Sequence, residues 1–388
     1  MKILLLHNYY QFSGGEDGVL QAEKDLLEAK GHQVILLQVS NHDITNPVEK
    51  INAAISAIYS FSSYQKVLKV IAEFKPDLAH IHNFFPLFSP SVYYACREAG
   101  IPVVQTLHNY RLLCLNAYLF REGKVCEDCL GKPIPIPGVL NGCYKDSKVG
   151  SAIVATMLST HRVLDTWTQM VDVYIALTEF SRQKFITNNL PPEKVVVKPN
   201  FVYPEPPAGN GEGNYALFVG RLSEEKGLDT LVEAWKTIGE KLPLKIVGDG
   251  PLAEQIVQSI EKMKGVEYLG RKTSEEVYAL LRDAKFLVFP SKWYEGLPRI
   301  IIEAYASATP IIASNLGSMS SLVKDGSTGL LFEPGNPQDL AAKVEWALNN
   351  TKKLIQMRHF SREEFEIQYT SEKNYKRLME IYGQIVNQ

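Results

Sequence analysis

Residues 291–306, SKWYEGLPRIIIEAYA, follow an apolar run at 284–290 and lead into a helix-forming run at 299–306. An apolar run of this length is typical of a strand that is buried on both faces of a parallel sheet. Pro298 suits the first turn of a helix, where its missing N–H costs no intrahelical hydrogen bond. Glu295 is therefore expected in a turn between a parallel strand and a helix, where α/β sheets bind ligands.

This stretch combines two carboxylates with backbone N–H groups. Gly296 and Leu297 follow Glu295, and N–H groups at the start of a helix suit an anion or a hydroxyl-rich ligand. Glu303 lies eight residues beyond Glu295 in the helical run. The two carboxylates could grip two ends of an elongated polyhydroxy ligand, although two Glu at this spacing also occur on ordinary surface helices.

The composition describes an ordinary globular protein of about two domains. The chain has 388 residues, of which 45% are hydrophobic and 22% charged, and its net charge of −2 indicates no nucleic-acid partner. The start, MKILLLHNYY, is too short in apolar residues for a signal peptide and is expected to be a strand. No window approaches the roughly 20 apolar residues that span a bilayer. We expect a cytoplasmic protein, with peripheral contact to the inner face of a membrane as a further expectation.

The first half alternates apolar runs with amphipathic segments, which predicts a doubly wound parallel sheet. His7, His82 and His108 each end a predicted strand, so they are expected at one ligand-binding edge of the sheet. The predicted strands are 2–7, 33–38, 77–82, 103–108 and 171–178, and the predicted helices are 18–29, 89–98 and 150–168.

The second half repeats this alternation after a Pro- and Gly-rich stretch at 200–213, which is expected to be a linker. The predicted domains are therefore 1–199 and 214–370, and an amphipathic segment at 371–388 completes the chain. The predicted strands are 216–220, 244–248, 266–270, 284–290 and 310–313, and the predicted helices are 227–239, 251–260, 274–283, 298–307 and 336–349.

Glycine-containing turns follow the first predicted strand of each domain. Another follows the second predicted strand of the C-terminal domain. Residues 220–227, GRLSEEKG, place Arg221 and Lys226 around a turn, where two cations can hold a diphosphate. An ordinary turn in which Glu224 and Glu225 neutralise the cations is the alternative. The turn 248–251, GDGP, and the turn 13–18, SGGEDG, also allow close backbone approach to a ligand.

Together these motifs resemble the retaining glycosyltransferases of family 4, which have the GT-B fold of two Rossmann-like doubly wound domains facing across a cleft. Glu295 and Glu303, separated by seven residues, match the E-x7-E motif of that family, and the turn at 220–227 resembles its phosphate-binding turn. The resemblance covers nearly the whole chain. It implies that the segment 371–388 crosses back to the N-terminal, acceptor-side domain, and that the C-terminal domain binds the nucleotide sugar.

The resemblance also assigns roles to single residues. His108 and Glu295 would contact the donor sugar, Arg221 and Lys226 would hold the diphosphate, and Glu303 would hold the ribose. The expected donor-binding set is Gly14, Gly15, Gly220, Arg221, Lys226, Gly248, Gly250, Gly296, Leu297, Pro298 and Glu303. The expected acceptor-side set is Glu16, Asp17, His82, Asn83 and Asn109. Alternatives stay open: Glu16 and Asp17 could simply be acids at a helix N-terminus, and His108 could be structural.

Arg299 departs from the family pattern, which commonly has an apolar residue after this proline. Its guanidinium could reach a phosphate or an acidic sugar, or it could neutralise a nearby charge.

A long loop at 109–146 carries four of the five cysteines, Cys114, Cys126, Cys129 and Cys143. One C-x-x-C pair with a single cysteine on either side is compatible with a four-thiolate zinc site, and buried free thiols are the alternative. Disulfides are not expected in a cytoplasmic protein. The segment 145–158 that follows is basic and then apolar, and is expected to be a core helix or a membrane contact.

The activity implied by the resemblance is transfer of a sugar, with retained configuration, from a nucleotide-diphosphate sugar to a hydroxyl of a glycan or lipid-linked acceptor. A uridine diphosphate sugar is the expected co-substrate, and no metal or other cofactor is required. Envelope or exopolysaccharide synthesis is the expected setting. A sugar-nucleotide epimerase of the same fold and a catalytically silent sugar-binding scaffold are the two alternatives.

Overall fold

The computed structural model describes residues 1–10, 14–41 and 54–386, in which the chain forms two compact units. The first unit comprises Met1–Leu119, Cys126–Asn200 and Glu372–Gln388, and the second comprises Phe120–Val125 and Phe201–Ser371. Ser13 of the glycine loop and the last two residues of the segment predicted at 371–388 lie outside the described residues. Each unit is built on a six-stranded parallel sheet, so the predicted fold class is confirmed.

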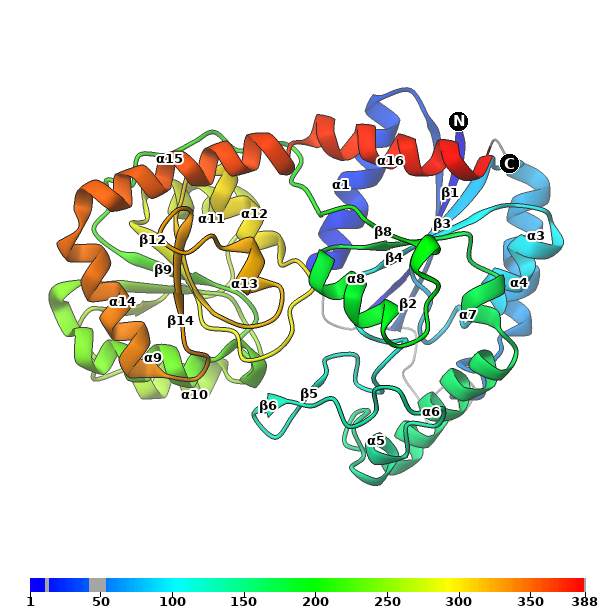
Figure 1. Ribbon diagram of the computed structural model, residues 1–388, viewed down its shortest axis with the longest axis horizontal. Helices are drawn as coiled ribbons and strands as arrows, with labels where there is room; N and C mark the ends of the chain where they lie inside the picture. The colour runs from blue at the N-terminus through cyan, green and yellow to red at the C-terminus, as the bar shows by residue number, and fades with distance from the viewer. Residues whose placement is uncertain (11–13, 42–53, 387–388) are drawn as a thin grey trace. The chain divides into compact units, whose positions relative to one another are not determined.

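The sheet of the first unit has the strand order β2-β1-β3-β4-β7-β8 (Figure 1). Its order reverses between β1 and β3, and such a reversal leaves a crevice at the carboxyl ends of the strands. The strands are β1 Lys2–Tyr9, β2 Gln33–Ser40, β3 Leu78–Asn83, β4 Val103–Leu107, β7 Val173–Ala176 and β8 Val195–Val197. The helices are α1 Gly15–Ala29, α3 Phe61–Phe74, α4 Ser91–Glu98, α5 Ile136–Leu140, α6 Lys148–Val163, α7 Thr166–Gln169, α8 Glu179–Ile186 and α16 Ser371–Val386.

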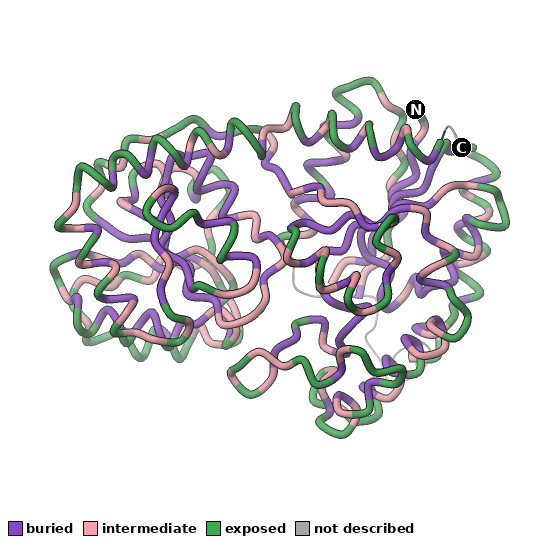
Figure 2. The backbone as a smooth tube through the Cα atoms, in the orientation of Figure 1, coloured by how far each residue is buried: buried purple, intermediate pink, exposed green. Residues whose placement is uncertain are grey.

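Helix α16, the last in the chain, belongs to the core of the first unit. Leu378, Ile381 and Tyr382 are buried in one cluster with Ile3 and Leu5 of β1. An apolar face at helical spacing therefore covers the N-terminal strand. In Figure 2 the strands are largely buried, whereas the helices alternate between buried and exposed positions.

The sheet of the second unit has the order β11-β10-β9-β12-β13-β14. This is the strand order of dinucleotide-binding sheets, and its reversal lies between β9 and β12. The strands are β9 Ala216–Val219, β10 Leu244–Val247, β11 Val266–Tyr268, β12 Phe286–Phe289, β13 Ile311–Ser314 and β14 Gly329–Phe332. The α-helices are α9 Leu228–Ile238, α10 Ala253–Ile260, α11 Ser274–Asp283, α12 Arg299–Ala306, α13 Met319–Leu322, α14 Pro337–Asn349 and α15 Thr351–Gln368. A two-stranded pairing of β5 Phe120–Arg121 with β6 Lys124–Val125 belongs to the same unit.

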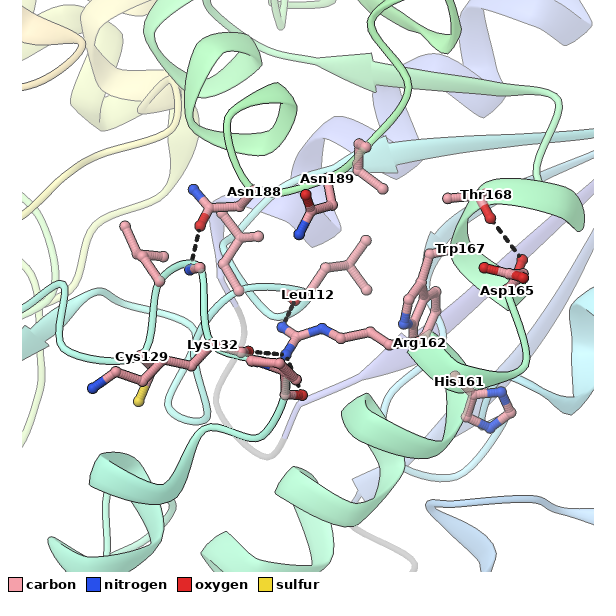
Figure 3. A pocket seen from close by; sticks show the side chains of 15 residues that line it. Leu112, Cys129, Lys132, His161, Arg162, Asp165, Trp167, Thr168, Asn188 and Asn189 are labelled. Carbon is pink, nitrogen blue, oxygen red and sulfur yellow. Dashed lines mark hydrogen bonds between the residues drawn. The ribbon is translucent and has the colours of Figure 1, made fainter.

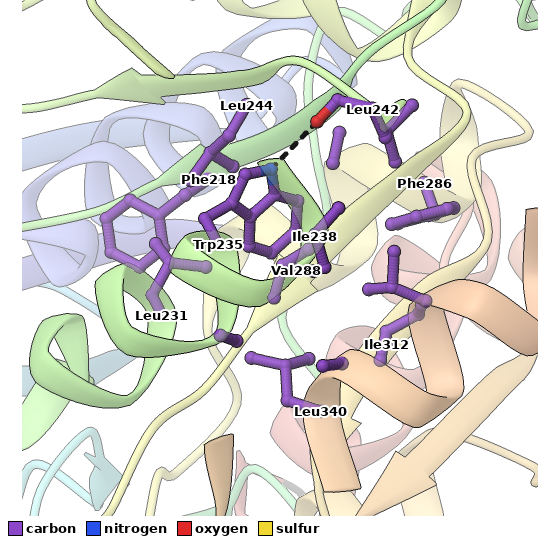
Figure 4. Close-up of a cluster of buried hydrophobic side chains, with 14 of the residues drawn as sticks. Phe218, Leu231, Trp235, Ile238, Leu242, Leu244, Phe286, Val288, Ile312 and Leu340 are labelled. Atoms are coloured by element: carbon purple, nitrogen blue, oxygen red, sulfur yellow. Dashed lines mark hydrogen bonds between the residues drawn. The ribbon is translucent and has the colours of Figure 1, made fainter. Parts of the chain in front are cut away.

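The core of the second unit packs around Trp235 of α9 (Figure 4). The indole is 1% exposed, and its Nε1–H donates to the carbonyl oxygen of Leu242 at 2.9 Å. Phe218, Phe286 and Ile312 from three adjacent strands lie in the same cluster. This packing fixes β9 and β12 side by side, and with them the two turns that follow these strands.

Several predicted boundaries are wrong. Helix α1 begins at Gly15 rather than at residue 18, and Pro298 is the N-cap of α12 rather than its first residue. The helix predicted at 150–168 is two helices, α6 and α7, because the chain leaves helical geometry at Asp165, which has a φ of 53°. Among the elements that lie wholly within the described residues, the pattern also missed five α-helices and four strands: α3, α5, α8, α13, α15, β5, β6, β8 and β14.

Candidate active site

The turns after β9 and β12 meet at the reversal of strand order in the second unit. The main chain of Gly227, with a φ of 69°, approaches Pro290 so closely that an added Cβ would lie 1.9 Å from the carbonyl oxygen of Pro290. Only glycine fits this contact, because any side chain would overlap the opposite backbone. The close approach brings Lys226 to Glu295, whose Oε1 lies 2.7 Å from the lysine Nζ.

Glu295 is buried and held by three donors. Its Oε1 accepts hydrogen bonds from Lys226 Nζ, Ser291 Oγ and Trp293 Nε1, each at 2.7 Å. Its backbone carbonyl accepts a fourth, from Ser318 Oγ at 2.8 Å. Glu295 thus lies in the expected strand-to-helix turn with one carboxylate oxygen fixed. The sequence reasoning missed Ser291 and Trp293, although both lie beside Glu295 in the chain.

Lys226 is partnered by Glu295 and not by the adjacent acids. Its ammonium also lies 5.4 Å from the centroid of the Trp293 ring and 5.6 Å from that of Phe289. Glu225 instead accepts from Ser223 Oγ at 2.5 Å. The lysine side chain is 17% exposed. A fixed, partly exposed ammonium is suited to an anionic ligand. Arg221, in the same turn, is exposed.

Arg299 neutralises a nearby charge, one of the roles left open for it. Its Nε lies 2.8 Å from Oε1 of Glu303, and its Nη2 donates to the hydroxyl of Tyr278 at 3.1 Å. Burial raises the pKa of Glu303, and the neighbouring Arg299 guanidinium opposes that rise. Tyr278, which comes from α11, was not among the predicted site residues.

The glycines of the GDGP turn serve backbone packing. An added Cβ on Gly248, whose φ is 142°, would lie 1.8 Å from the carbonyl oxygen of Gly220. The N–H groups of Gly220, Gly248 and Gly250 donate to Val247 O, Gly270 O and Asp249 Oδ1. These three N–H groups are therefore already used within the protein, and a nucleotide contact of these glycines stays a prediction.

In the first unit, Asp17 ties the start of α1 to β1. Its Oδ2 accepts from the N–H of Gly14 at 3.0 Å, and its Oδ1 lies 2.8 Å from Nε2 of His7. The N–H of Gly14 is therefore already used by Asp17, and a contact of Gly14 with the donor stays a prediction. Helix α1 begins at the next residue, Gly15, which is exposed.

Glu16, Asn83 and Asn109 come together beside Asp17. Asn83 Nδ2 donates to Asn8 O at 2.7 Å and lies 3.4 Å from Oε1 of Glu16. Burial and the charge of Asp17 raise the pKa of Glu16 to about 8, although a hydrogen bond from Asn109 acts in the opposite direction. A carboxyl group with such a pKa is largely protonated at neutral pH and can donate a hydrogen bond.

A buried polar chain links β3, β4 and α1. His82 Nε2 lies 3.2 Å from Oε1 of Glu23, and His82 Nδ1 lies 3.0 Å from Nε2 of His108. The second carboxylate oxygen of Glu23 is 3.1 Å from Lys198 Nζ. Periodicity did not reveal Glu23 or Lys198, because Glu23 stands among other charged residues of α1 and Lys198 directly follows the three valines of β8.

Two groups of described residues gather potential metal ligands, Glu23 with His80 and His82, and His7 with Glu16 and Asp17. In the first group, the Lys198 ammonium already neutralises Glu23 and disfavours a second cation. Neither group contains a cysteine. In the loop at 109–146, burial raises the pKa of Cys129 to about 11. A cavity of about 270 Å³ beside this loop contains none of the predicted site residues; Figure 3 shows Arg162 donating there to the carbonyl of Leu112.

Solved structures share this two-unit architecture. The crystal structure of the Anabaena protein HepE in complex with UDP has a TM-score of 0.69 with this chain at 18% identity, and covers 99% of this chain and 100% of that one. A similarity of that extent establishes the fold, which is the GT-B fold of two Rossmann-like units.

Family models cover nearly the whole chain. Residues 24–205 match the model described as glycosyltransferase family 4, and residues 203–364 match the one described as glycosyl transferases group 1. The chain therefore belongs to the family 4 glycosyltransferases, as the motifs predicted.

Two curated relatives illustrate this membership. The alpha-monoglucosyldiacylglycerol synthase of Streptococcus pneumoniae is 24% identical over 98% of this chain and 84% of its own length. An uncharacterized glycosyltransferase of Methanocaldococcus jannaschii is 33% identical over 52% of this chain. The chain spans 58%, 62% and 63% of the length of three curated relatives that it matches. Within the described residues, no helix is both long enough and apolar enough to cross a bilayer.

Proposed function

We propose that this protein transfers a sugar from a nucleotide-diphosphate sugar, with UDP as the nucleotide, to a hydroxyl of a glycan or lipid-linked acceptor. The anomeric configuration is retained and no metal takes part. The observation that carries the proposal is the pairing of Lys226 with buried Glu295 at the reversal of strand order in the second unit. The Anabaena protein of the same fold was solved with UDP and with UDP-glucose, and the pneumococcal relative is named for a lipid product.

In this proposal the second unit binds the donor. Departure of the nucleoside diphosphate builds negative charge on the phosphates, and fixed cations stabilise that charge best because they need no reorganisation. Lys226 and Arg221 supply these cations, with the start of α12 after Gly296 and Leu297 as a further source of positive potential. Glu303 accepts from the ribose hydroxyls.

Glu295 positions the donor sugar and does not attack it. Its Oε1 already accepts three hydrogen bonds, one of them from an ammonium group, which makes that oxygen a poor nucleophile. The acceptor hydroxyl attacks the face that the leaving group vacates, and the departing phosphate takes its proton. The paired-carboxylate chemistry of glycosidases is therefore not used.

In the first unit, Glu16, Asp17, Asn83 and Asn109 serve the acceptor, and His108 contacts the donor sugar. Protonated Glu16 donates to an acceptor oxygen at neutral pH, while Asp17 keeps the turn in place through Gly14 and His7. Envelope or exopolysaccharide synthesis at the cytoplasmic face of a membrane is the proposed setting.

The test is a binding and transfer experiment with UDP, UDP-sugars and GDP-sugars, each with and without a chelator. We expect UDP and one UDP-sugar to bind, and the chelator to leave both binding and transfer unchanged. NMR of the product should show the anomeric configuration of the donor. Interconversion of the sugar nucleotide without an acceptor would instead indicate an epimerase, and sugar binding without turnover would indicate a scaffold.

Lys226→Met should weaken UDP binding. Loss of a charge-assisted hydrogen bond costs about 1.5–3 kcal/mol, which is roughly 10- to 150-fold in affinity. Lys236→Met is the matched control, because Lys236 lies on the exposed side of α9 and pairs only with Glu233 in the described part of the chain. Glu295→Ala should lower transfer strongly, and transfer at the wild-type rate in this variant would refute the assigned role of Glu295.

A further inference from the structure

The buried chain from Glu23 to His108 has a defined direction of hydrogen bonding. Glu23 is 1% exposed, and its two oxygens face His80, His82 and Lys198 at 3.0, 3.2 and 3.1 Å. Burial opposes its charge, but Lys198 and His80 hold the pKa of Glu23 well below its usual range. Glu23 is therefore a carboxylate, which can only accept hydrogen bonds.

Because Glu23 accepts, Nε2 of His82 must carry the hydrogen of their contact at 3.2 Å. Burial and the neighbouring His80 lower the pKa of His82 to about 4, so its ring is neutral near pH 7. A neutral imidazole with its hydrogen on Nε2 has an unprotonated Nδ1, which is an acceptor. In the contact of 3.0 Å between the two rings, the hydrogen must therefore come from Nε2 of His108.

The same logic determines the outer nitrogen of His108. Burial and His82 lower the pKa of His108 well below its usual range, so this ring is neutral as well. With its hydrogen on Nε2, Nδ1 carries a lone pair. Among residues 1–10, 14–41 and 54–386, no hydrogen-bond partner of that Nδ1 is found, and the His108 residue is only half-buried.

We infer that Glu23 and His82 are positioning residues that fix the hydrogen of His108 on Nε2 and present its Nδ1 as an acceptor for a ligand hydroxyl. The ligand class is a sugar, because a polyhydroxy ring offers donors that a phosphate lacks. This assignment of the ligand rests on the proposed function, whereas the direction of the hydrogen bonds does not. Lys198 completes the arrangement by joining Glu23 to Asn374 of α16, 3.2 Å away.

The hydrogen bonds from Glu23 through His82 to His108 also limit what His108 can bind. A ring whose Nδ1 accepts cannot donate to the diphosphate from the same atom, so His108 discriminates the sugar and leaves the charge of the leaving group to other residues. A ligand that lacks the hydroxyl contacted by His108 should bind more weakly, through the loss of that one hydrogen bond.

The experiment is NMR of the full chain labelled with ¹⁵N-histidine near pH 7. We expect His82 and His108 both as neutral rings with hydrogen on Nε2, and a ¹⁵N–¹⁵N coupling across the hydrogen bond between His108 Nε2 and His82 Nδ1. Hydrogen on Nδ1 of either ring would overturn the inference. His82→Ala should abolish the coupling, whereas His82→Asn keeps an acceptor oxygen near the position of Nδ1 and should leave the His108 Nε2–H hydrogen-bonded.

Ligand addition separates this inference from the proposed function. A UDP-sugar should move the Nδ1 resonance of His108 upfield, as expected when a lone pair accepts a hydrogen bond, and UDP alone should not. Binding of both ligands without a response at His108 would overturn the inference and leave the donor site standing. If neither UDP nor the UDP-sugar bound, the proposed function would be contradicted. The coupling between the two rings would still support the inferred direction of the hydrogen bonds.

Discussion

Arg299 lies 2.8 Å from Glu303 and favours its charged form, and this pair gives a prediction for a single side chain. Burial raises the pKa of Glu303 and Arg299 opposes the rise, so Arg299→Leu should raise that pKa further. More of the carboxyl group is then protonated at a given pH. UDP affinity should fall about tenfold, as for loss of one charged hydrogen bond, and should fall most at the acidic end.

Titration calorimetry with UDP between about pH 5.5 and 8.5 measures this effect. Arg271→Leu, at an exposed position of the same unit, is the control and should behave as wild type. An Arg299→Leu curve parallel to that of the wild type would show that Arg299 does not govern the charge of Glu303.

At the residue scale, the sequence predicted where Glu295 lies but not what holds it. Strand and helix periodicity locate a turn, and the turn locates its carboxylate. Ser291 and Trp293 donate to that carboxylate because of the rotamers that they adopt in an irregular segment. Periodicity carries no information on such rotamers. The same limit hid Tyr278, which reaches Arg299 from a different helix.

At the scale of elements, helix α16 is anchored to the sheet of the first unit by a hydrogen bond. The hydroxyl of buried Tyr382 lies 2.7 Å from Nδ1 of His80. Tyr382→Phe should lower the free energy of unfolding by about 1 kcal/mol, the typical net value of one such bond. The cost stays modest because the same His80 nitrogen also lies 3.0 Å from Glu23.

Urea denaturation followed by circular dichroism measures this change. Tyr375→Phe is the matched control on the same helix, since that hydroxyl pairs with His32, whose residue is only half-buried. Equal losses in the two variants would mean that the Tyr382–His80 bond contributes nothing beyond a surface contact.

Most apolar strands and amphipathic helices were predictable, although α3, β8 and β14 were missed, and the mostly polar helices α8 and α15 were not. Helix α8, EFSRQKFI, buries only Ser181 and Phe185, so its apolar signal is too sparse to stand out. Helix α15 is mostly polar, yet Leu354, Met357 and Phe365 are buried on one face of it. Both helices depend on tertiary packing, which is the usual source of helix stability and leaves a weak trace in the sequence.

For the whole molecule, the raised pKa of Glu16 predicts a pH-dependent stability. The pKa of Glu16 is about 8 in the folded protein, so the proton stays on up to about that pH, whereas an unfolded glutamate loses it near its ordinary pKa of 4.5. Between these values the folded state binds more protons, so stability falls as pH rises. Glu16→Gln removes the contribution of this proton to the pH dependence of stability. The melting temperature of this variant should exceed that of the wild type increasingly from about pH 5 to pH 8.5.

Calorimetry at matched pH values tests this, with Glu28→Gln at an exposed position of the same helix as the control. A melting-temperature difference that does not change with pH would refute the protonation of Glu16 in the folded state.

The docking of α16 also has a consequence for synthesis. The first unit is interrupted by Phe201–Ser371 and is completed only by residues from Glu372 onward. At about 5–20 residues per second, a ribosome takes roughly 10 to 30 s to translate the intervening segment. Throughout that time the nascent N-terminal sheet lacks the helix that covers Ile3 and Leu5, while the second unit can already collapse behind it. The first unit is thus completed only after the second unit has been made, and a chain released before Glu372 would leave the first unit, rather than the second, prone to aggregate.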